Sequence, residues 1–569
     1  MAYVPPTAEQ LFVLEHVVRV GELAGHNRFA EATPDLVGAI VEGAAAFAAG
    51  EFAPLNRIGD TTGARWSPDG VTMPPGFREA YRAYVEGGWG TLAGPQEHGG
   101  QGLPLTLATV VMEDLGSANM AFSLCPMLTA GAIEALSHHG SAELKARYLP
   151  KLVSGEWTGT MNLTEPQAGS DVGALKSRAV PNGDGSWSVT GQKIFITFGD
   201  HDLADNIVHL VLARTPDAPP GTRGISLFLV PKTLPDGSGN DLRCVSIEHK
   251  MGIHASPTCV MSYGDEDRCT GWLIGPEAGG MRAMFTMMNN ARLNVGLQGV
   301  SIAEAATQDA VAYARQRVQG SREGRQVAIV EHPDVRRMLL RMKALTQAAR
   351  ALAYYSAGQT DRARLGDSAA KARADLLTPL VKTYGTDVGV EVASLGVQVH
   401  GGMGYIEEAG AAQHLRDVRI APIYEGTNGI QAADLVIRKI GLEGGAVLER
   451  LLDDIRTGAG GALLALADAV EQVSQWMRDS SDEDRLAGSY PLTTMLSVAV
   501  AAWLMHRQEA VADVMLKDGA GDPLFVGMKL GAADYYRRCV IPEALALKPA
   551  AMAGADFLWV FPDREFSGG

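Results

Sequence analysis

Two changes of hydrophobic periodicity divide this sequence into regions of different secondary structure. Before about Glu156 the apolar residues recur at helical spacing. From there to about Gly279 the chain carries short runs rich in β-branched and aromatic residues, each bounded by Gly, Pro, Asp or Asn. After Gly279 helical spacing returns and continues toward the end of the chain. The pattern predicts a fold of the α+β class, mostly α, in which one β domain lies between helical regions.

The length and these changes of pattern predict several domains. A single hydrophobic core does not extend to 569 residues, and about three or four domains are expected at this length. The long helical stretches of the third region are joined by short loops, which is typical of a bundle. We expect an N-terminal helical domain, a middle β-barrel or sandwich, a C-terminal four-helix bundle and an appended helical domain, over residues 1–157, 158–280, 281–441 and 442–569.

The same patterns predict individual elements. Strands are expected over 187–197, 207–213, 225–230 and 259–263. Residues 51–77 are rich in Pro, Gly and Asp, and we expect an excursion there without helix. Helices are expected over 77–85, 105–115, 130–148, 281–320, 333–364, 369–399 and 430–440.

Composition excludes several classes of function. A net charge of −16 and a pI near 5.3 argue against a nucleic-acid partner or an anionic membrane surface. The five cysteines show no ligand-like spacing, so we expect no metal site and reduced thiols in the cytoplasm. The N-terminus has no basic region followed by an apolar run, so no secretory signal is expected. Residues 492–505, the longest apolar stretch, are too few to span a bilayer and predict a buried helix, so no membrane insertion is expected.

Glu425 is an unusual carboxylate near the end of the third region. Pro422 disfavours helix just before it, Gly426 and Gly429 permit tight backbone, and helical spacing resumes after Gly429. We therefore expect Glu425 on a connection between two helices, close to a helix N-terminus. The apolar residues that precede it would disfavour the charged carboxylate and raise its pKa toward the range of a general base. The alternative is a solvated glutamate in a turn.

Two glycine-containing stretches of the first half are candidates for binding a polar group. Residues 161–171 form a turn-rich strand exit whose hydroxyls and backbone N–H groups could cradle a phosphate or a polar ring edge. The alternative is a Pro/Gly turn in which Ser170 and Asp171 only cap. Residues 99–102 lack the preceding strand and following helix of a dinucleotide fingerprint, so a loop is expected there.

Four stretches of this sequence closely resemble motifs of the acyl-CoA dehydrogenase family, and they occur in the family's order and near its spacing. They are Met161 to Asp171, Lys193 to Thr197, Gln398 to Tyr405 and Ile423 to Thr427. The resemblance covers roughly residues 80–441. It implies FAD between the β domain and the bundle, α,β-dehydrogenation of an acyl-CoA to the trans-2-enoyl-CoA, and electron transfer to an electron-transfer flavoprotein. It also implies a homo-oligomer, with a dimer favoured, because family members bind the cofactor across subunits.

The resemblance assigns roles to residues of this chain. Glu425 would be the catalytic base that removes the α proton, and Arg317 with the 398–402 stretch would reach the FAD of a neighbouring subunit. The expected substrate contacts are Ser170, Asn289, Arg292, Tyr424 and Gly426. The expected FAD contacts are Met161, Leu163, Thr164, Gly169, Ser170, Phe195, Ile196, Thr197, Arg317, Gln398, Gly401, Gly402, Thr427 and Gly429.

The sequence also departs from the family pattern. Phe195 stands where tryptophan is usual, so it can pack on a flavin but lacks the indole donor. Asn289 precedes Arg292 where charged residues are common, which weakens the substrate assignments there. Ala291 occupies the position that supplies the base in a minority of relatives, and alanine cannot accept a proton. For Arg317 the alternative is a solvated helix face, and for His400 it is a hydrogen-bonded histidine inside the bundle.

The size of the chain indicates which branch of the family it resembles. The 51–77 excursion, the loop at 231–243 and the helical tail after 441 resemble an enlarged bacterial branch that includes 3-methylmercaptopropionyl-CoA dehydrogenases. That likeness favours 3-methylmercaptopropionyl-CoA or another short to medium acyl-CoA. The tail is expected to cover part of the bundle without supplying catalytic groups. Two alternatives stay open: a flavin acyl-CoA oxidase that uses O2, and a non-catalytic flavin-binding module.

Overall fold

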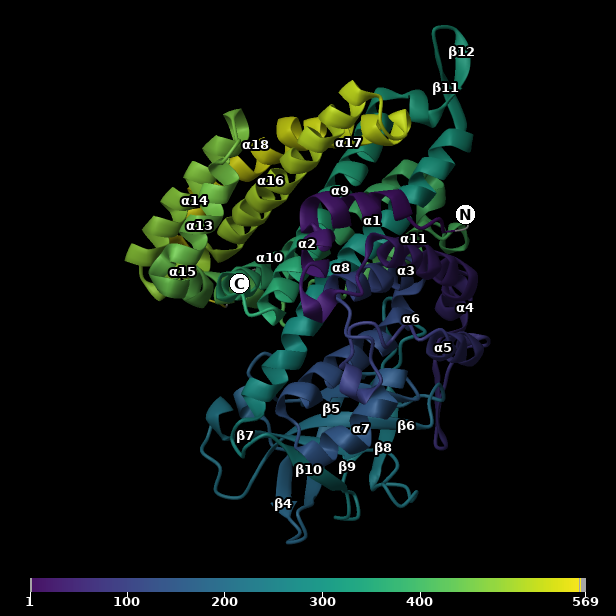
Figure 1. Ribbon diagram of the computed structural model, residues 1–569, viewed down its shortest axis with the longest axis vertical. Coiled ribbons are helices and arrows are strands. Elements are labelled where there is room, and N and C mark those ends of the chain that lie inside the picture. The colour runs from purple at the N-terminus through teal and green to yellow at the C-terminus, as the bar shows by residue number, and fades with distance from the viewer. Residues whose placement is uncertain (1–2, 562, 564–569) are drawn as a thin grey trace. The chain divides into compact units, whose positions relative to one another are not determined.

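The computed structural model describes residues 3–561 and 563 (Figure 1). Its contacts separate the chain into two compact units. The N-terminal unit comprises Asp35–Asn294 with the few residues before Pro6, and the C-terminal unit comprises Pro6–Pro34 with the chain from Val295 onward. Most of the described residues are helical and the sheet lies in the middle of the sequence, so the expected fold class is confirmed. The four domain boundaries stay a prediction.

Helices form the first half of the N-terminal unit. The expectation of an excursion without helix at 51–77 was wrong, because α4 occupies most of its first half and a short hairpin of β1 (Arg65–Ser67) and β2 (Gly70–Thr72) follows. Pro54 lies in the first turn of α4, directly after the π-helical turn η3. The helices are α3 (Pro34–Phe47), the π-helix η3 (Ala48–Phe52), α4 (Ala53–Thr62), α5 (Phe77–Glu86), α6 (Leu105–His139) and α7 (Ala142–Ser154).

The helix α6 continues where the sequence predicts a gap between 115 and 130. Asn119 has non-helical backbone angles inside it, so two helical pieces meet at a kink there. The expected helix 130–148 is broken at Gly140, and Ser141 is the N-cap of α7, with its hydroxyl accepting the Leu144 N–H (3.2 Å). This N-cap stabilises the first turn of α7, so α7 begins as a separate helix.

Two stretches of the described residues are long and apolar enough to cross a membrane by length and composition alone, Pro34–Thr62 and Leu105–His139. In the second, 83% of the apolar window is buried inside the protein, as in the central helix of a globular fold. The first consists of three consecutive elements, and its Phe52 stacks on Phe122 of α6 with ring centroids 4.3 Å apart. We therefore assign both stretches to the folded core and neither to a membrane.

The middle of the chain folds into an eight-stranded sheet in the order β10-β7-β6-β4-β5-β9-β8, with β3 paired parallel to β6. Because β10 also pairs with β5, the sheet closes on itself like a barrel. The four strands expected from the sequence are confirmed as β5, β6, β7 and β9. The strands are β3 (Trp157–Asn162), β4 (Arg178–Pro181), β5 (Trp187–Thr197), β6 (Asn206–Arg214), β7 (Ile225–Pro231), β8 (Leu242–Ile247), β9 (Thr258–Tyr263) and β10 (Thr270–Ile274).

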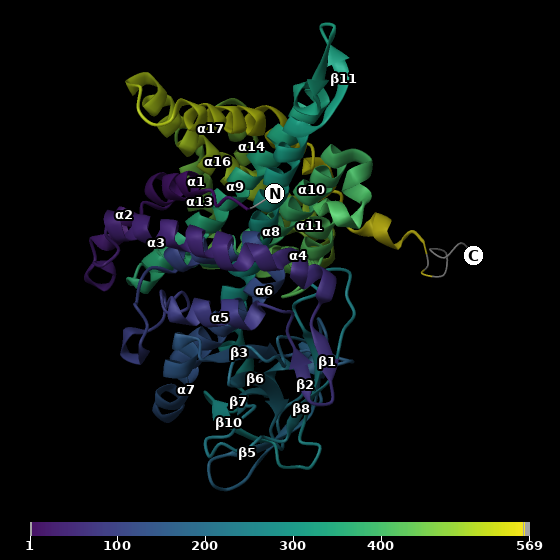
Figure 2. The same cartoon turned by 90° about the vertical axis from the view of Figure 1, so that its right-hand side faces the viewer.

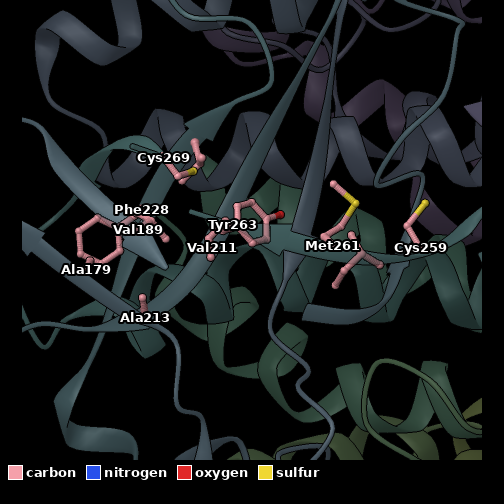
Figure 3. Close-up of a cluster of buried hydrophobic side chains, with 11 residues drawn as sticks. Ala179, Val189, Val211, Ala213, Phe228, Cys259, Met261, Tyr263 and Cys269 are labelled. Carbon is pink, nitrogen blue, oxygen red and sulfur yellow. The ribbon is translucent and has the colours of Figure 1, made fainter. Parts of the chain in front are cut away.

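Apolar side chains from several strands fill the inside of this sheet. Figure 3 shows Val211, Phe228, Met261 and Tyr263 gathered in this cluster, all at most 2% exposed. Trp187 packs on Phe228 with ring centroids 5.4 Å apart. The alternation of buried and exposed residues along the strands therefore builds one core for the β region.

Long helices form the bundle of the C-terminal unit. The helix expected to 320 ends instead at Gln316, and a hairpin of β11 (Val318–Arg322) and β12 (Arg325–Ala328) projects from the helices (Figures 1 and 2). A Cβ on Gly296 would lie 2.4 Å from the Val381 carbonyl oxygen, so glycine lets α8 and α10 approach closely. The helices are α8 (Gly280–Gln316), whose first residues belong to the N-terminal unit, α9 (Pro333–Arg364), α10 (Ser368–His400), α11 (Ala411–Val418) and α12 (Asn428–Asp434).

The tail after the bundle is helical, as expected. Its long helix α16 (Ser489–Asp518) is buried over 492–505, which confirms the buried helix expected there. Figure 2 shows α16 and α17 beside α9, and α16 also contacts α10 and α12. The remaining helices of the tail are α13 (Ala446–Arg456), α14 (Gly461–Asp479), α15 (Asp482–Ala487), α17 (Pro523–Tyr535), the π-helix η12 (Tyr536–Val540), α18 (Ile541–Leu545) and α19 (Lys548–Ala551).

The start of the chain belongs to the same unit as the tail. It forms α1 (Thr7–Val13), the π-helix η1 (Leu14–Val18) and α2 (Val20–Ala24). Lys529 of α17 donates to Glu9 of α1 (2.8 Å), and both side chains are buried. The first helices and the last ones are thus joined by a buried ion pair.

Candidate active site

Glu425 lies on the loop between α11 and α12, as the sequence predicts. The Asn428 N–H donates to the Pro422 carbonyl (2.9 Å) and closes the loop around it. Thr427 is the N-cap of α12, and its hydroxyl accepts the Ile430 N–H (3.1 Å). The carboxylate is therefore carried by a short loop that is fixed at the first turn of a helix.

The backbone at Glu425 is in a conformation that side chains disfavour. Its φ is 58°, and the φ of Gly426 is 79°, so two consecutive residues are left-handed. This conformation costs a residue with a Cβ about 1–2 kcal/mol, and such residues concentrate at functional sites. Exposed turn residues such as Asp217 and Glu323 also have positive φ, so the role of Glu425 stays a prediction that this backbone strain motivates.

The residue before Glu425 is a tyrosine whose hydroxyl is hydrogen-bonded. Glu425 and Tyr424 are both half-buried, and the Tyr424 hydroxyl donates to the Gln298 amide oxygen. Burial, together with the negative charge of Glu425, raises the pKa of Tyr424 above its usual range. The phenol therefore stays neutral beside the carboxylate and remains a hydrogen-bond donor.

Asn428 is a site residue that the sequence analysis missed. Its side chain is 3% exposed and its amide accepts from Lys382 Nζ (2.8 Å) and donates to Asp387 (2.8 Å). Both partners are on α10, more than forty residues earlier in the chain. No local pattern could have indicated them, because only the packing of α10 against α12 brings the three residues together.

The first candidate cofactor stretch follows β3, as a strand exit should. Leu163 and Thr164 come directly after the strand, and a tight turn of Glu165 with Ala168 follows. Gly169 and Ser170 are exposed beyond that turn. The stretch thus presents backbone groups and a hydroxyl at the edge of the sheet.

A buried ion pair that the sequence analysis also missed fixes this stretch. Lys193 Nζ donates to Glu165 (2.8 Å) and to the Leu163 carbonyl (3.1 Å). Burial alone would raise the pKa of Glu165. The charge of Lys193 and hydrogen bonds from Lys193 and Ser177 outweigh burial and lower this pKa to about 2. Burial lowers the pKa of Lys193 to about 8, and Glu165 limits the drop. Both groups are therefore charged at neutral pH, and they hold the strand exit in place.

The second cofactor stretch lies beside the first. The Ile194 N–H donates to the Thr164 carbonyl (2.9 Å), and the strand register shifts between Lys193 and Ile196. Within this bulge Phe195 has a φ of 60° and is 58% exposed, an unusual position for a large aromatic ring. The structure thus brings Met161 to Ser170 and Phe195 to Thr197 together, with Phe195 directed away from the core.

Three of the expected FAD contacts, Met161, Ile196 and Thr197, are less exposed than Phe195. Ile196 is 2% exposed and belongs to the core of the β region, so its side chain is not accessible to a ligand. Met161 is half-buried within β3, and Thr197 is half-buried at the end of β5. The contacts expected from these residues stay predictions.

The candidate residues at the end of α10 are open to ligand. Gln398, Gly401 and Gly402 are exposed, and a Cβ on either glycine would meet no atom within 4 Å. His400 is buried, its Nδ1 donates to the Gly396 carbonyl (2.7 Å), and its ring lies 4.4 Å from that of Tyr313. The structure therefore favours the hydrogen-bonded interior histidine for His400.

The remaining candidates are divided between surface and interior. Arg317 is exposed between α8 and β11, and Asn289 is exposed on α8. Arg292 is buried, with its guanidinium 5.8 Å from the centre of the Phe285 ring. Ala291 is buried too. Among the described residues, no three His, Cys, Asp or Glu side chains gather as a metal site.

Comparison with known proteins accounts for this arrangement. Models of the acyl-CoA dehydrogenase N-terminal, middle and C-terminal domains match residues 38–156, 160–265 and 278–440. A further model, acetyl-CoA dehydrogenase C-terminal like, matches residues 437–562. The 3-methylmercaptopropionyl-CoA dehydrogenase of Ruegeria pomeroyi is 46% identical over 96% of this chain and 97% of its own. The chain belongs to the acyl-CoA dehydrogenase family.

Solved structures of the family share the fold. An acyl-CoA dehydrogenase of Bacillus anthracis, complexed with FAD, superposes with a TM-score of 0.75 at 21% identity over 94% of this chain and 90% of its own. A chain from the structure reported as an electron transferring flavoprotein of Acidaminococcus fermentans matches with a TM-score of 0.61 at 29% identity, over 71% of this chain and 98% of its own. The resemblance inferred from the four stretches is confirmed, and the protein is an FAD-dependent oxidoreductase of the acyl-CoA dehydrogenase class.

Proposed function

We propose that this protein dehydrogenates a short acyl-CoA thioester at its α and β carbons, with Glu425 as the base. The observation that carries the proposal is the left-handed, half-buried Glu425 on a loop fixed at the start of α12. 3-Methylmercaptopropionyl-CoA is the first candidate substrate, because the Ruegeria pomeroyi enzyme of that name is 46% identical over nearly the whole chain.

In this proposal Glu425 removes the α proton of the thioester. Enolate charge then develops on the thioester carbonyl, and a donor aimed at that oxygen stabilises it. The N–H of Glu425 is the donor that the family resemblance implies. Tyr424 and Gly426 flank the base on a loop that the Asn428 N–H closes, and a fixed base removes much of the entropic cost of proton transfer. FAD, when bound, accepts the hydride that leaves the β carbon.

The residues present fit FAD. Phe195 offers an exposed aromatic face, and the Thr164 and Ser170 hydroxyls lie on the neighbouring strand exit. Gly401 and Gly402 leave open space beside the exposed Gln398 for a phosphate group to approach the backbone. We propose that these residues hold the cofactor, together with Met161, Leu163, Gly169, Ile196, Thr197, Arg317, Thr427 and Gly429.

The assembly and the electron acceptor are parts of the same proposal. We expect Arg317 and the 398–402 stretch to bind the FAD pyrophosphate of a neighbouring subunit, which requires at least a dimer. An electron-transfer flavoprotein is the proposed acceptor, and the match to the Acidaminococcus fermentans structure supports it. The five cysteines are free thiols, which fits the reducing cytoplasm.

Anaerobic flavin bleaching tests the proposed reaction. The purified protein is mixed without oxygen with 3-methylmercaptopropionyl-CoA, butyryl-CoA and palmitoyl-CoA, and the loss of flavin absorbance is followed. We expect fast bleaching with the two short substrates and slow bleaching with the long one. Bleaching by none of them would contradict the proposed reaction, and rapid peroxide formation in air without an added acceptor would favour the oxidase instead.

A further inference from the structure

The first residue of α12 is held by a cluster of polar side chains from three helices. We call it the Asn428 cluster. Asn428 belongs to α12 and Tyr490 to α16 of the tail, whereas Lys382, Thr386 and Asp387 belong to α10. The cluster therefore joins the appended tail to the helix that follows the base.

The hydrogen bonds of the Asn428 amide are specific. Its oxygen accepts from Lys382 Nζ (2.8 Å), which can only donate, and its nitrogen donates to an Asp387 carboxylate oxygen (2.8 Å). The nitrogen also donates to the Thr386 hydroxyl (3.0 Å). Because a cation and a carboxylate bind opposite ends of the amide, the Asn428 side chain has a single favourable orientation.

Tyr490 completes the cluster from the tail. Its hydroxyl donates to the second Asp387 carboxylate oxygen (2.7 Å). Burial holds the pKa of Asp387 above its ordinary value and Glu391 adds to the rise, while hydrogen bonds from Tyr490 and Asn428 and the charge of Lys382 offset only part of it. The tail thus contributes a donor to a half-buried carboxylate whose other donor is Asn428.

The cluster connects to the base through the backbone. The Asn428 N–H holds the Pro422 carbonyl (2.9 Å), and Glu425 with Gly426 lies inside the loop that this bond closes. The two left-handed residues store strain, so their geometry persists only if the end of the loop is fixed. A displacement of Asn428 therefore moves Glu425.

We propose that Tyr490 is a positioning residue for Glu425, acting through Asp387 and Asn428. The inference rests on the proposed function, in which Glu425 is the base. It gives the appended tail a part in the reaction without any contact with the substrate. A misplacement of about 1 Å can cost roughly 100-fold in rate, so one hydrogen bond at this distance from the base is enough to matter.

Tyr490→Phe tests the proposal, with Tyr536→Phe as the matched control. The Tyr536 hydroxyl also bonds a residue of α10, Tyr384 (2.6 Å), from the tail. We expect both variants to keep their FAD content and their acyl-CoA affinity. At saturating 3-methylmercaptopropionyl-CoA or butyryl-CoA, Tyr490→Phe should slow anaerobic flavin reduction by about 10- to 100-fold, and Tyr536→Phe should change it by less than about threefold.

A double-mutant cycle separates positioning from general loss of structure. In a Glu425→Gln background, Tyr490→Phe should cause no further slowing, because the group that it positions is gone. Asp387→Asn provides a second route to the same result, since its remaining oxygen can serve only one of the two donors. We expect it to slow reduction in the same direction as Tyr490→Phe.

The outcomes distinguish the two proposals. If Tyr490→Phe slows reduction no more than Tyr536→Phe does, or slows the Glu425→Gln enzyme by the same factor as wild type, the positioning role is refuted. If Glu425→Gln itself reacts within about tenfold of wild type, a range that removal of a general base exceeds, the proposed function fails whatever Tyr490 does.

Discussion

Replacing Lys193 by Met should destabilise the N-terminal unit strongly. The side chains of Lys193 and Glu165 are 0% and 3% exposed, so the change leaves a carboxylate buried without its counter-ion. Breaking a buried ion pair in this way costs about 3–5 kcal/mol. Glu165 keeps donors in the Ser177 hydroxyl (2.6 Å), the Ser177 N–H (3.0 Å) and the Lys176 N–H (2.6 Å), so we expect the lower end, about 3 kcal/mol.

The variant should also change how stability depends on pH. In the native protein the pKa of Glu165 is lowered from 4.5 to about 2, so its contribution is present above pH 4.5 and lost as pH falls toward 2. Without Lys193, burial raises this pKa. The native Lys193→Met protein then binds a proton at Glu165 more readily than the unfolded chain does, so it should regain part of the lost stability as pH falls through the raised pKa.

Urea denaturation, followed by circular dichroism and by flavin release, measures the loss. The double variant Glu165→Gln/Lys193→Met is the control, because no unpaired charge remains, and it should recover more than half of the loss. FAD content should fall in the single variant, since Lys193 fixes the strand exit that carries Thr164. A loss below about 1 kcal/mol in the single variant, without recovery in the double variant, would refute this reasoning.

Three further predictions concern the base and the tail. Glu425→Gln should retain FAD and acyl-CoA binding but bleach several orders of magnitude more slowly in stopped-flow measurements; a rate within about tenfold of wild type would contradict its role. Gly426→Ala forces a Cβ into a φ of 79°, so it should lower the melting temperature and the bleaching rate, and unchanged values of both would show that the loop adapts without cost. Truncation before Leu442 removes Lys529 and the tail residues that pack on the first helices, exposes the apolar face of those helices, and should impair solubility or assembly in gel filtration; a soluble, FAD-loaded truncation would show that the tail is not needed for stability.

Much of the fold could be predicted from local sequence. The strand at 187–197 has the same bounds in the structure, because Gly185 and Gly199 flank it. The missed hairpin at 318–328 has almost fully exposed strands, so no burial pattern marks it. The missed strand β3 follows directly after a helix, and its partner β6 begins more than forty residues later. Elements that depend on distant partners left no local periodicity to find.

The site divides in the same way. The position of Glu425 between two helices could be predicted because Pro422 and Gly426 act on neighbouring backbone alone. The Glu165–Lys193 pair spans 28 residues and the Asp387–Tyr490 bond spans 103, so neither could be recognised from spacing. A polar side chain that the fold buries looks, in sequence, the same as one that it leaves in water.

The ion pair between Glu9 and Lys529 has a consequence for synthesis of the protein. The two residues are 520 positions apart, so at about 5–20 residues per second the ribosome completes the second roughly half a minute to two minutes after the first. During that interval the apolar faces of the first helices lack their final cover, whereas the N-terminal unit, which ends at Asn294, is complete in sequence well before Lys529 is added. Chaperones that bind nascent chains should therefore engage the first thirty residues long after residues 35–294 have folded.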